Sequence, residues 1–155
     1  MQGFPSNMKN ISGLLLSICL FSVVHVGTAG TWQSMVEDQL IATNMVTHAA
    51  ILGHDGSTWG SSKDFTVSLQ EGQTILSNFG NTDAMQQNGI TVNEVKYMYF
   101  SSTDKVIRAK KGTWGVHIFK TNQALLIGVY EDPIVPEQAA TVIEKLGDYL
   151  ISTGY

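Results

Sequence analysis

The feature that most constrains the fold of this chain is a run of short apolar segments between residues 90 and 130. Each segment has the length and the alternating pattern of a β-strand, and turn-forming pairs such as Lys111-Gly112 and Thr121-Asn122 separate them. This spacing of turns and strands predicts an antiparallel meander. The predicted strands cover residues 90–100, 106–110, 114–119 and 124–130.

Helical patterns flank the run of strands. Apolar residues recur at helical spacing from Trp32 to Leu40, and Thr31 can act as the N-cap. A second amphipathic helix is predicted from Pro136 to about residue 151, because proline suits the first helical turn and one apolar stripe follows it. Two terminal helices and a central antiparallel sheet predict a domain of the α+β class.

Shorter elements are predicted between the first helix and the meander. Residues 49–52 form a strand that leads to Asp55-Gly56, a pair that favours a tight hairpin turn. Apolar residues alternate at positions 65, 67 and 69, and residues 74–79 are predicted to form a short helix. Asn88-Gly89 is a second turn signal.

Residues 1–29 differ in composition from the rest of the chain. Lys9 is their only charged residue, residues 14–24 are an uncharged apolar run, and Gly27 and Ala29 follow. The pattern is typical of a secretory signal peptide, and the run is shorter than the roughly 20 apolar residues of a membrane span. The alternative is a leader that is disordered in, or absent from, the working protein. We therefore divide the chain into an apolar leader, 1–29, and one domain, 30–155.

Residue patterns that indicate catalysis are scarce. The sequence contains no phosphate-binding glycine loop, no nucleophile elbow and no helix with paired histidines. His48, His54 and His117 are too scattered to propose as metal ligands, and the single Cys19 excludes a disulfide framework. We expect no enzymatic activity, no metal site and no cofactor.

Aromatic residues gather near both ends of the domain. Trp32 opens the first helix, Trp59 follows the predicted hairpin turn, and Tyr149 and Tyr155 lie at the end of the chain. If the terminal helices pack side by side, these rings can share one surface. Such a surface suits a polyproline II ligand, because indole N–H and phenol O–H groups bond its exposed carbonyls. The alternative is that the rings only pack the helix pair onto the sheet.

Charge is distributed unevenly along the chain. The net charge of -4 argues against a general nucleic-acid-binding role. Residues 96–120 nevertheless carry six basic side chains and one acidic one, a local net charge of +5. A basic surface of this kind suits an acidic partner or phosphate groups, and lysines that protect a sheet edge are the alternative.

Six short motifs follow one another along residues 30–155, and their order and spacing are more specific than any one of them. They are Trp32-Gln33; Gly53-His54-Asp55-Gly56-Ser57-Thr58-Trp59; Asn88-Gly89-Ile90 with Lys96-Tyr97; Ile107-Arg108-Ala109-Lys110-Lys111-Gly112; Lys120-Thr121-Asn122-Gln123-Ala124-Leu125; and Leu146-Gly147-Asp148-Tyr149-Leu150. With these motifs the chain resembles the profilin family, in particular its plant, fungal and some invertebrate members. The resemblance implies that the terminal helices pack together on one face of the sheet and short helices on the other.

The resemblance also implies a polyproline-binding groove. Carried over by position, the groove consists of Trp32, Met35, Trp59, Tyr149, Leu150 and Tyr155. Profilins usually have a tyrosine where this chain has Met35. Methionine keeps the packing against a proline ring but lacks the phenol hydrogen bond, which is worth roughly 1 kcal/mol. We therefore expect weaker binding of proline-rich ligands.

Two further sites follow from the resemblance. The actin-binding surface maps onto Lys96, Arg108, Lys110, Thr113, Val135, Glu137 and Lys145. Phosphoinositide head groups would be bound by Arg108, Lys110, Lys111 and Lys120. Because the two basic sites overlap, actin and lipid are expected to compete.

The family likeness implies a monomeric, non-enzymatic protein of the cytoplasm and cytoskeleton that binds monomeric actin. It would regulate actin polymerisation, promote nucleotide exchange on actin, and bind proline-rich assembly factors and phosphoinositides. One alternative is a small-ligand sensor domain with an apolar cavity among Phe65, Phe79, Tyr97 and Trp114. Another is a protein of the secretory route that has the same fold and no actin role.

Overall fold

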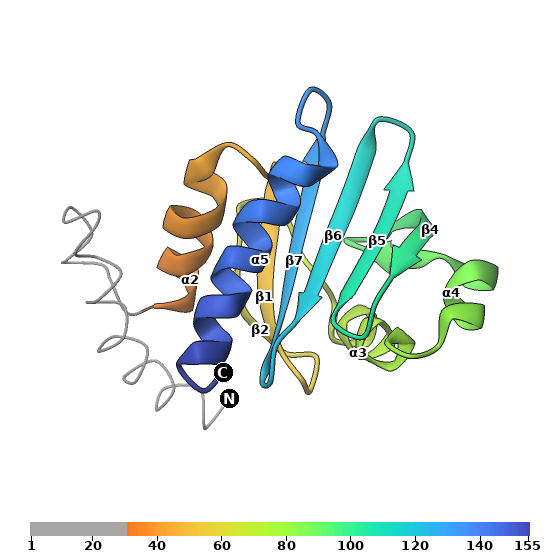
Figure 1. Cartoon of the computed structure of the whole chain (residues 1–155), viewed down its shortest axis with the longest axis horizontal. Helices are drawn as coiled ribbons and strands as arrows, with labels where there is room; N and C mark the ends of the chain where they lie inside the picture. Colours follow the sequence, from red (N-terminus) through yellow and green to blue (C-terminus); the bar gives the residue numbers. More distant parts are fainter. Residues whose placement is uncertain (1–30) are drawn as a thin grey trace.

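A computed structural model describes residues 31–155, and the predicted leader lies outside the described residues. The described chain forms one seven-stranded sheet in the order β2-β1-β7-β6-β5-β4-β3, and all neighbouring strands are antiparallel (Figure 1). Strands β3 to β7 follow one another in chain order, which confirms the predicted meander. The single strand predicted over residues 90–100 was wrong, because a turn at Asn93 and Glu94, both with positive φ, divides it into β3 and β4. The strands are β1 (His48–Gly53), β2 (Thr58–Ser61), β3 (Ile90–Val92), β4 (Val95–Ser102), β5 (Val106–Lys111), β6 (Trp114–Lys120) and β7 (Ala124–Glu131).

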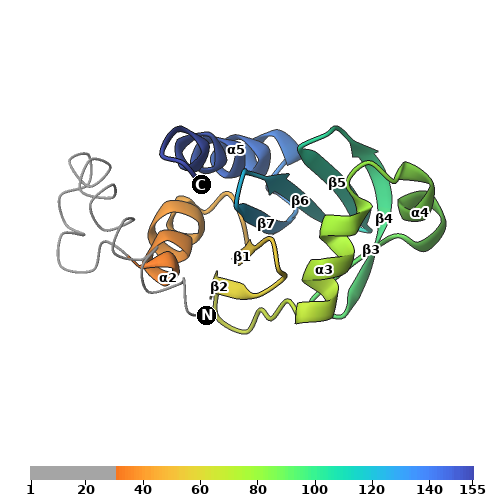
Figure 2. The same cartoon turned by 90° about the horizontal axis from the view of Figure 1, so that it is seen from below.

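Helices cover both faces of the sheet. The first helical stretch consists of α2 (Trp32–Met35), the π-helical segment η1 (Val36–Leu40) and the 3₁₀ segment η2 (Ile41–Thr43). It packs with α5 (Pro136–Ser152) on one face, and α3 (Leu69–Asn78) lies on the other with α4 (Thr82–Asn88) beside it (Figure 2). The predicted α+β class and the two-sided arrangement of helices are therefore confirmed.

Alternation along the strands divides the core into two layers. On β7, Leu126 packs in the cluster beneath α2 and α5, while Leu125 and Ile127 pack in the cluster on the α3 side. All three side chains are fully buried. Burial on both faces explains why this strand is a continuous apolar run instead of an alternating one.

Two predictions between the first helix and the meander were wrong in detail. Leu69 does not continue a strand-like alternation, because Ser68 and Glu71 form a capping box that starts α3 at this point. The helix predicted over 74–79 therefore begins five residues earlier. The turn signal Asn88-Gly89 ends α4, a helix that the sequence patterns did not predict, and Gly89 has a φ of 69°.

The helices leave part of the sheet uncovered. Helix α5 contacts β6 and β7, and the first helical stretch contacts β1 and β2, so the same face of β4 and β5 is open. None of the helices in residues 31–155 is long and apolar enough to cross a membrane. The uncovered strands and the aromatic end of the helix pair are the surfaces that the sequence analysis singles out.

Candidate functional site

The structure brings the aromatic residues of the two termini together. The ring of Trp32 lies 4.5 Å from that of Trp59 on β2, at an interplanar angle of 44°. The ring of Tyr155 meets Trp32 edge to face, with the centroids 5.5 Å apart. Tyr149 packs against the same core cluster. We refer to Trp32, Trp59, Tyr149 and Tyr155 as the terminal aromatic cluster.

Hydrogen bonds from the β6–β7 turn hold the end of the chain in this cluster. The hydroxyl of Thr121 donates to the backbone carbonyl of Tyr155 at 2.8 Å, and the backbone N–H of Gln123 donates to the same oxygen. The side-chain amide of Gln123 donates to the carbonyl of Gly154 at 2.9 Å. A chain end frays unless it is held, and these bonds hold it.

Hydrogen bonds also fix the start of the domain. Thr31 caps α2 by accepting a hydrogen bond from the N–H of Ser34 at 2.8 Å. The side-chain amide of Gln33 binds both backbone groups of Ser61 on β2, donating at 2.7 Å and accepting at 3.1 Å. Gly60 permits this approach, because a Cβ at that position would lie 2.8 Å from the backbone oxygen of Trp32. Trp32 is thereby positioned against Trp59.

Burial differs among the residues of the predicted groove. Trp32 and Leu150 are fully buried, and Met35 and Tyr155 are buried in the same cluster. Trp59 and Tyr149 are partly exposed, so they are the members that a ligand in solution meets first. The indole N–H of Trp32 is buried and has no hydrogen-bond partner among residues 31–155. A buried donor without an acceptor costs about 1–3 kcal/mol, so a ligand carbonyl that reached this N–H after a local rearrangement would be stabilising.

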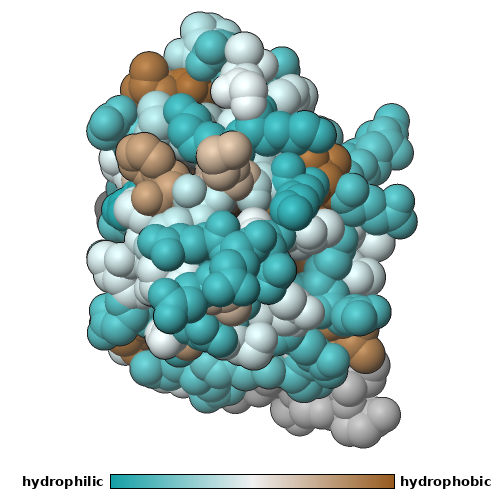
Figure 3. Space-filling model, turned by 90° about the vertical axis from the view of Figure 1, so that its right-hand side faces the viewer, coloured by the Kyte–Doolittle hydropathy of each residue, from teal (hydrophilic) through white to brown (hydrophobic). Residues whose placement is uncertain are grey.

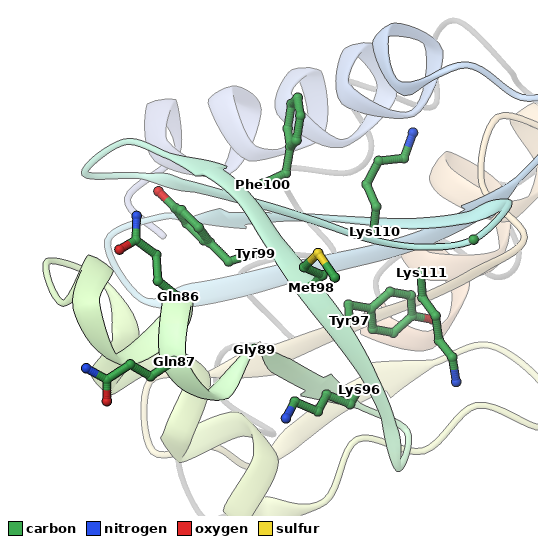
Figure 4. Close-up of a pocket in the computed structure, with 11 residues that line it drawn as sticks. Gln86, Gln87, Gly89, Lys96, Tyr97, Met98, Tyr99, Phe100, Lys110 and Lys111 are labelled. Atoms are coloured by element: carbon green, nitrogen blue, oxygen red, sulfur yellow. The ribbon is translucent and has the colours of Figure 1, made fainter.

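A second surface lies on the uncovered strands β4 and β5. Met98 and Phe100 are 77% and 67% exposed, which is unusual for apolar side chains of this size. They line a hollow of about 570 Å³ together with Lys96 and Lys110 (Figure 4). Phe100 and Lys110 point to the side of the sheet that carries α5. Seen from the end of the sheet that carries β4 and α4, the molecule shows separate hydrophobic groups among hydrophilic ones (Figure 3).

Met98 and Phe100 were not among the residues that the sequence analysis proposed. The signal was present, because residues 90–100 alternate in two registers at once. Tyr97 is buried in the α3-side cluster and Tyr99 packs against it, so the intervening apolar residues face the opposite side. When both alternating sets of positions on a strand are apolar and only one face is covered, the other set forms an exposed apolar surface.

The other residues of the predicted actin surface border this hollow or extend toward α5. Thr113 is exposed in the β5–β6 turn, and its carbonyl accepts a hydrogen bond from Asp132 just before α5. Val135 and Glu137 are exposed at the start of α5, and Lys145 is exposed further along it. Arg108 approaches Glu144 of α5 at 4.0 Å and donates to the hydroxyl of Ser101.

A buried histidine on β6 supports the junction between α5 and the sheet. His117 is 2% exposed, and its Nε2 donates to the Glu144 carboxylate at 2.8 Å. Burial lowers the pKa of His117; the Glu144 carboxylate opposes this shift and the Arg108 guanidinium adds to it. The imidazole is therefore neutral near pH 7, and it orients the carboxylate that faces Arg108.

Comparison with known proteins decides the family. The family model described as Profilin matches residues 30–155. The profilin of Drosophila melanogaster is 49% identical over 125 residues, which are 81% of this chain and 99% of that protein. The chain belongs to the profilin family. The crystal structure of Acanthamoeba castellanii profilin II is 42% identical, with a TM-score of 0.78 over 81% of this chain and all of that one.

The profilin fold extends to more distant structures. Mouse profilin IIa, solved in complex with a double repeat from the FH1 domain of mDia1, is 17% identical and has a TM-score of 0.69. It covers 80% of this chain and 99% of its own. At that identity the likeness concerns the fold alone.

The four cations assigned to phosphoinositides do not form one cluster in this profilin. Arg108 and Lys110 alternate with Lys111 along β5, so Lys111 faces the α3 side. Lys120 lies at the opposite end of the β5–β6 pair, where its Nζ is 4.8 Å from the centroid of the Phe79 ring. Arg108 and Lys110 therefore share one face, Lys111 lies at the adjacent edge, and Lys120 is separate.

The lowered pKa of His117 predicts a pH-dependent stability. An unfolded histidine takes up a proton below about pH 6.5, whereas the buried imidazole resists protonation, so the folded state loses stability as pH falls through this range. Between pH 7 and pH 5 the chain should lose up to about 1 kcal/mol more unfolding free energy than His117→Gln, measured by urea denaturation. Equal losses in the two proteins would contradict this assignment.

Proposed function

We propose that this profilin regulates actin assembly by binding monomeric actin, and that it also binds proline-rich ligands and phosphoinositide head groups. The family match over residues 30–155 is the observation that carries the proposal. Binding to actin would favour a more open nucleotide cleft and so speed nucleotide exchange, which is a shift of population and requires no catalytic residue in this chain. The proposal places the chain in the cytoplasm, at the cytoskeleton, as a monomer.

Proline-rich ligands are assigned to the terminal aromatic cluster. A polyproline II segment presents carbonyls that lack internal hydrogen bonds, and the Trp32 indole N–H lacks an acceptor. Trp59 and Tyr149 offer partly exposed rings for proline to pack against. Met35 and Leu150 support the rings from within the core and have little surface of their own.

Removing the indole N–H should weaken this binding. Trp32→Phe keeps an aromatic ring but loses one hydrogen bond of about 1 kcal/mol, so the affinity for a polyproline peptide should fall about fivefold in calorimetric titration. Trp114→Phe, the same change on the α3 side of the sheet, is the matched control and should leave the affinity unchanged. Equal effects of the two substitutions would remove the terminal aromatic cluster from the proposal.

Actin is assigned to the hollow on β4 and β5 with its extension to α5. An exposed apolar pair, Met98 and Phe100, is bordered by Lys96, Arg108 and Lys110. Protein interfaces commonly combine a desolvated apolar centre with charged groups at the rim, which set the rate of association with a partner of opposite charge. The terminal aromatic cluster lies at the β2 end of the sheet, so the two partners would bind at once.

Phe100 is the sharpest test of the actin surface. Phe100→Ala removes apolar area that actin would cover, which is expected to weaken binding by about 1–2 kcal/mol, or roughly five- to thirtyfold. In a pyrene-actin assay, correspondingly more of the variant should be needed to slow spontaneous nucleation. Leu69→Ala is the matched control, because Leu69 is 55% exposed at the start of α3 on the other side. A loss of activity in both variants, or in neither, would contradict the assignment.

Phosphoinositide head groups are assigned to Arg108, Lys110 and Lys111, at the open end of β5. Because Arg108 and Lys110 also belong to the actin surface, vesicles containing phosphatidylinositol bisphosphate should release this profilin from actin in a sedimentation assay. Lys110→Gln should reduce the binding to vesicles, and Lys120→Gln should reduce it much less, since Lys120 lies at the other end of the strand. Simultaneous binding of actin and lipid without mutual weakening would disprove the overlap.

A further inference from the structure

A pocket of about 480 Å³ opens on the sheet face opposite α5, away from the terminal aromatic cluster, and it shares Tyr97, Lys111 and Gly112 with the hollow on β4 and β5. It lies between the β3–β4 turn, which contributes Asn93, and the β5–β6 turn, which follows Lys111. Its volume is within the range of pockets that hold small molecules in proteins. Three of the four residues of the apolar cavity considered in the sequence analysis, Phe65, Tyr97 and Trp114, line it, while Phe79 instead contacts Lys120.

The walls of the pocket include three nearly parallel rings from three parts of the chain. His48, at the start of β1, lies 5.4 Å from the ring of Phe65 with an interplanar angle of 8°. Trp114, at the start of β6, lies 6.4 Å from the His48 ring at an interplanar angle of 13°. Phe65 is buried, whereas His48 and Trp114 are partly exposed. Partly exposed rings that lie nearly parallel favour a ligand that is itself a flat ring, stacked with an offset.

The polar groups around the pocket are mainly hydrogen-bond donors. Within residues 31–155, neither the ring nitrogens of His48 nor the indole N–H of Trp114 has a hydrogen-bond partner, and Lys111 forms no ion pair. The side-chain oxygen of Asn93 accepts from the N–H of Thr66 at 3.3 Å, which leaves its amide hydrogens to donate. A pocket rich in donors and containing one ammonium group selects an acceptor with negative charge.

The rim on the β3–β4 side is held in place by one carboxylate. Glu71 of α3 accepts hydrogen bonds from the backbone N–H groups of Asn93 at 3.0 Å and Glu94 at 2.8 Å. Asn93 and Glu94 both have positive φ, 51° and 63°, so the turn adopts a conformation that needs such support. The pocket is therefore bounded by a fixed turn, and Lys111 lies beside Tyr97 (Figure 4).

We propose that this pocket is a ligand site for a small planar aromatic anion, such as a bicyclic aromatic carboxylic acid. The ligand packs its ring against the partly exposed side chains of His48 and Trp114, and its carboxylate faces Lys111 and the donors of Asn93 and Trp114. This inference does not depend on the actin or proline assignments. If the pocket were only a loosely packed end of the α3-side core, it would bind neutral and anionic aromatic rings equally. The experiment below distinguishes that case from a specific anion site.

The experiment titrates 1-naphthoate into the ¹⁵N-labelled full chain and follows the indole N–H signals of its three tryptophans by NMR. The Trp114 signal should shift saturably, while those of Trp32 and Trp59 stay in place. Cyclohexanecarboxylate, which has the charge without the flat ring, should cause no saturable shift. Shifts confined to Trp32 and Trp59, or no saturable shift at all, would overturn the proposal.

Two lysine variants test the anionic part. Lys111→Gln should weaken the binding of 1-naphthoate about two- to fivefold, as expected for one partly solvated ion pair, and should not change the binding of neutral 1-naphthalenemethanol. Lys120→Gln, which removes a lysine from the far end of β6, is the matched control and should have no effect. Equal effects of the two variants, or equal affinity of the acid and the alcohol, would overturn the proposal. Lys111 is exposed, so its replacement does not disturb the core.

Discussion

The placement of both termini on the sheet depends on a small set of polar contacts. The carbonyl of Tyr155 accepts bonds from the β6–β7 turn, and the amide of Gln33 joins α2 to β2. Without them, the last residue and the first helix would each be held mainly by apolar packing, which has no preferred direction. Directional hydrogen bonds fix which ring meets which, so the geometry of the terminal aromatic cluster is a consequence of these contacts.

The candidate sites lie on both faces of the sheet and toward both of its ends. Its α5 face carries the terminal aromatic cluster at the β2 end and the open hollow of β4 and β5 at the other. Its α3 face is mostly core, apart from the pocket beside His48 and Trp114. Because neighbouring residues of a strand point to opposite faces, Lys110 and Lys111 project to different sides of β5 although they are adjacent in the chain. Charge counted along the sequence therefore overstates the charge that any one ligand meets.

Much of the fold followed from local patterns. The meander was predictable because each strand is bounded by turn-forming residues, and α5 because proline starts it and one apolar stripe continues it. Helix α4 was missed, since its residues include Gln86, Gln87 and Asn88 and offer only a weak apolar pattern. The early start of α3 depended on a reciprocal bond between Ser68 and Glu71, which only the spacing of the two residues could have indicated.

The sites were harder to predict than the fold. The aromatic residues were found because they are rare and lie at the chain ends, but the degree of their burial depends on tertiary packing that no local pattern reports. Phe100 illustrates the opposite case, since an apolar residue in a strand is normally assigned to the core. The separation of Lys120 from Lys110 could be predicted only from the strand register. Lys110 pairs with Gly115 next to the β5–β6 turn, whereas Lys120 lies at the far end of β6.

Gln33 has a further consequence for the behaviour of the folded chain in solution. Strand β2 ends the sheet on one side, and a terminal strand with free backbone groups can template pairing with another molecule. The amide of Gln33 copies the donor and acceptor of a peptide group and binds both backbone groups of Ser61, so that position is already paired. The side chain of a single glutamine thus takes the place of a neighbouring strand at this position and discourages pairing of β2 with a second molecule.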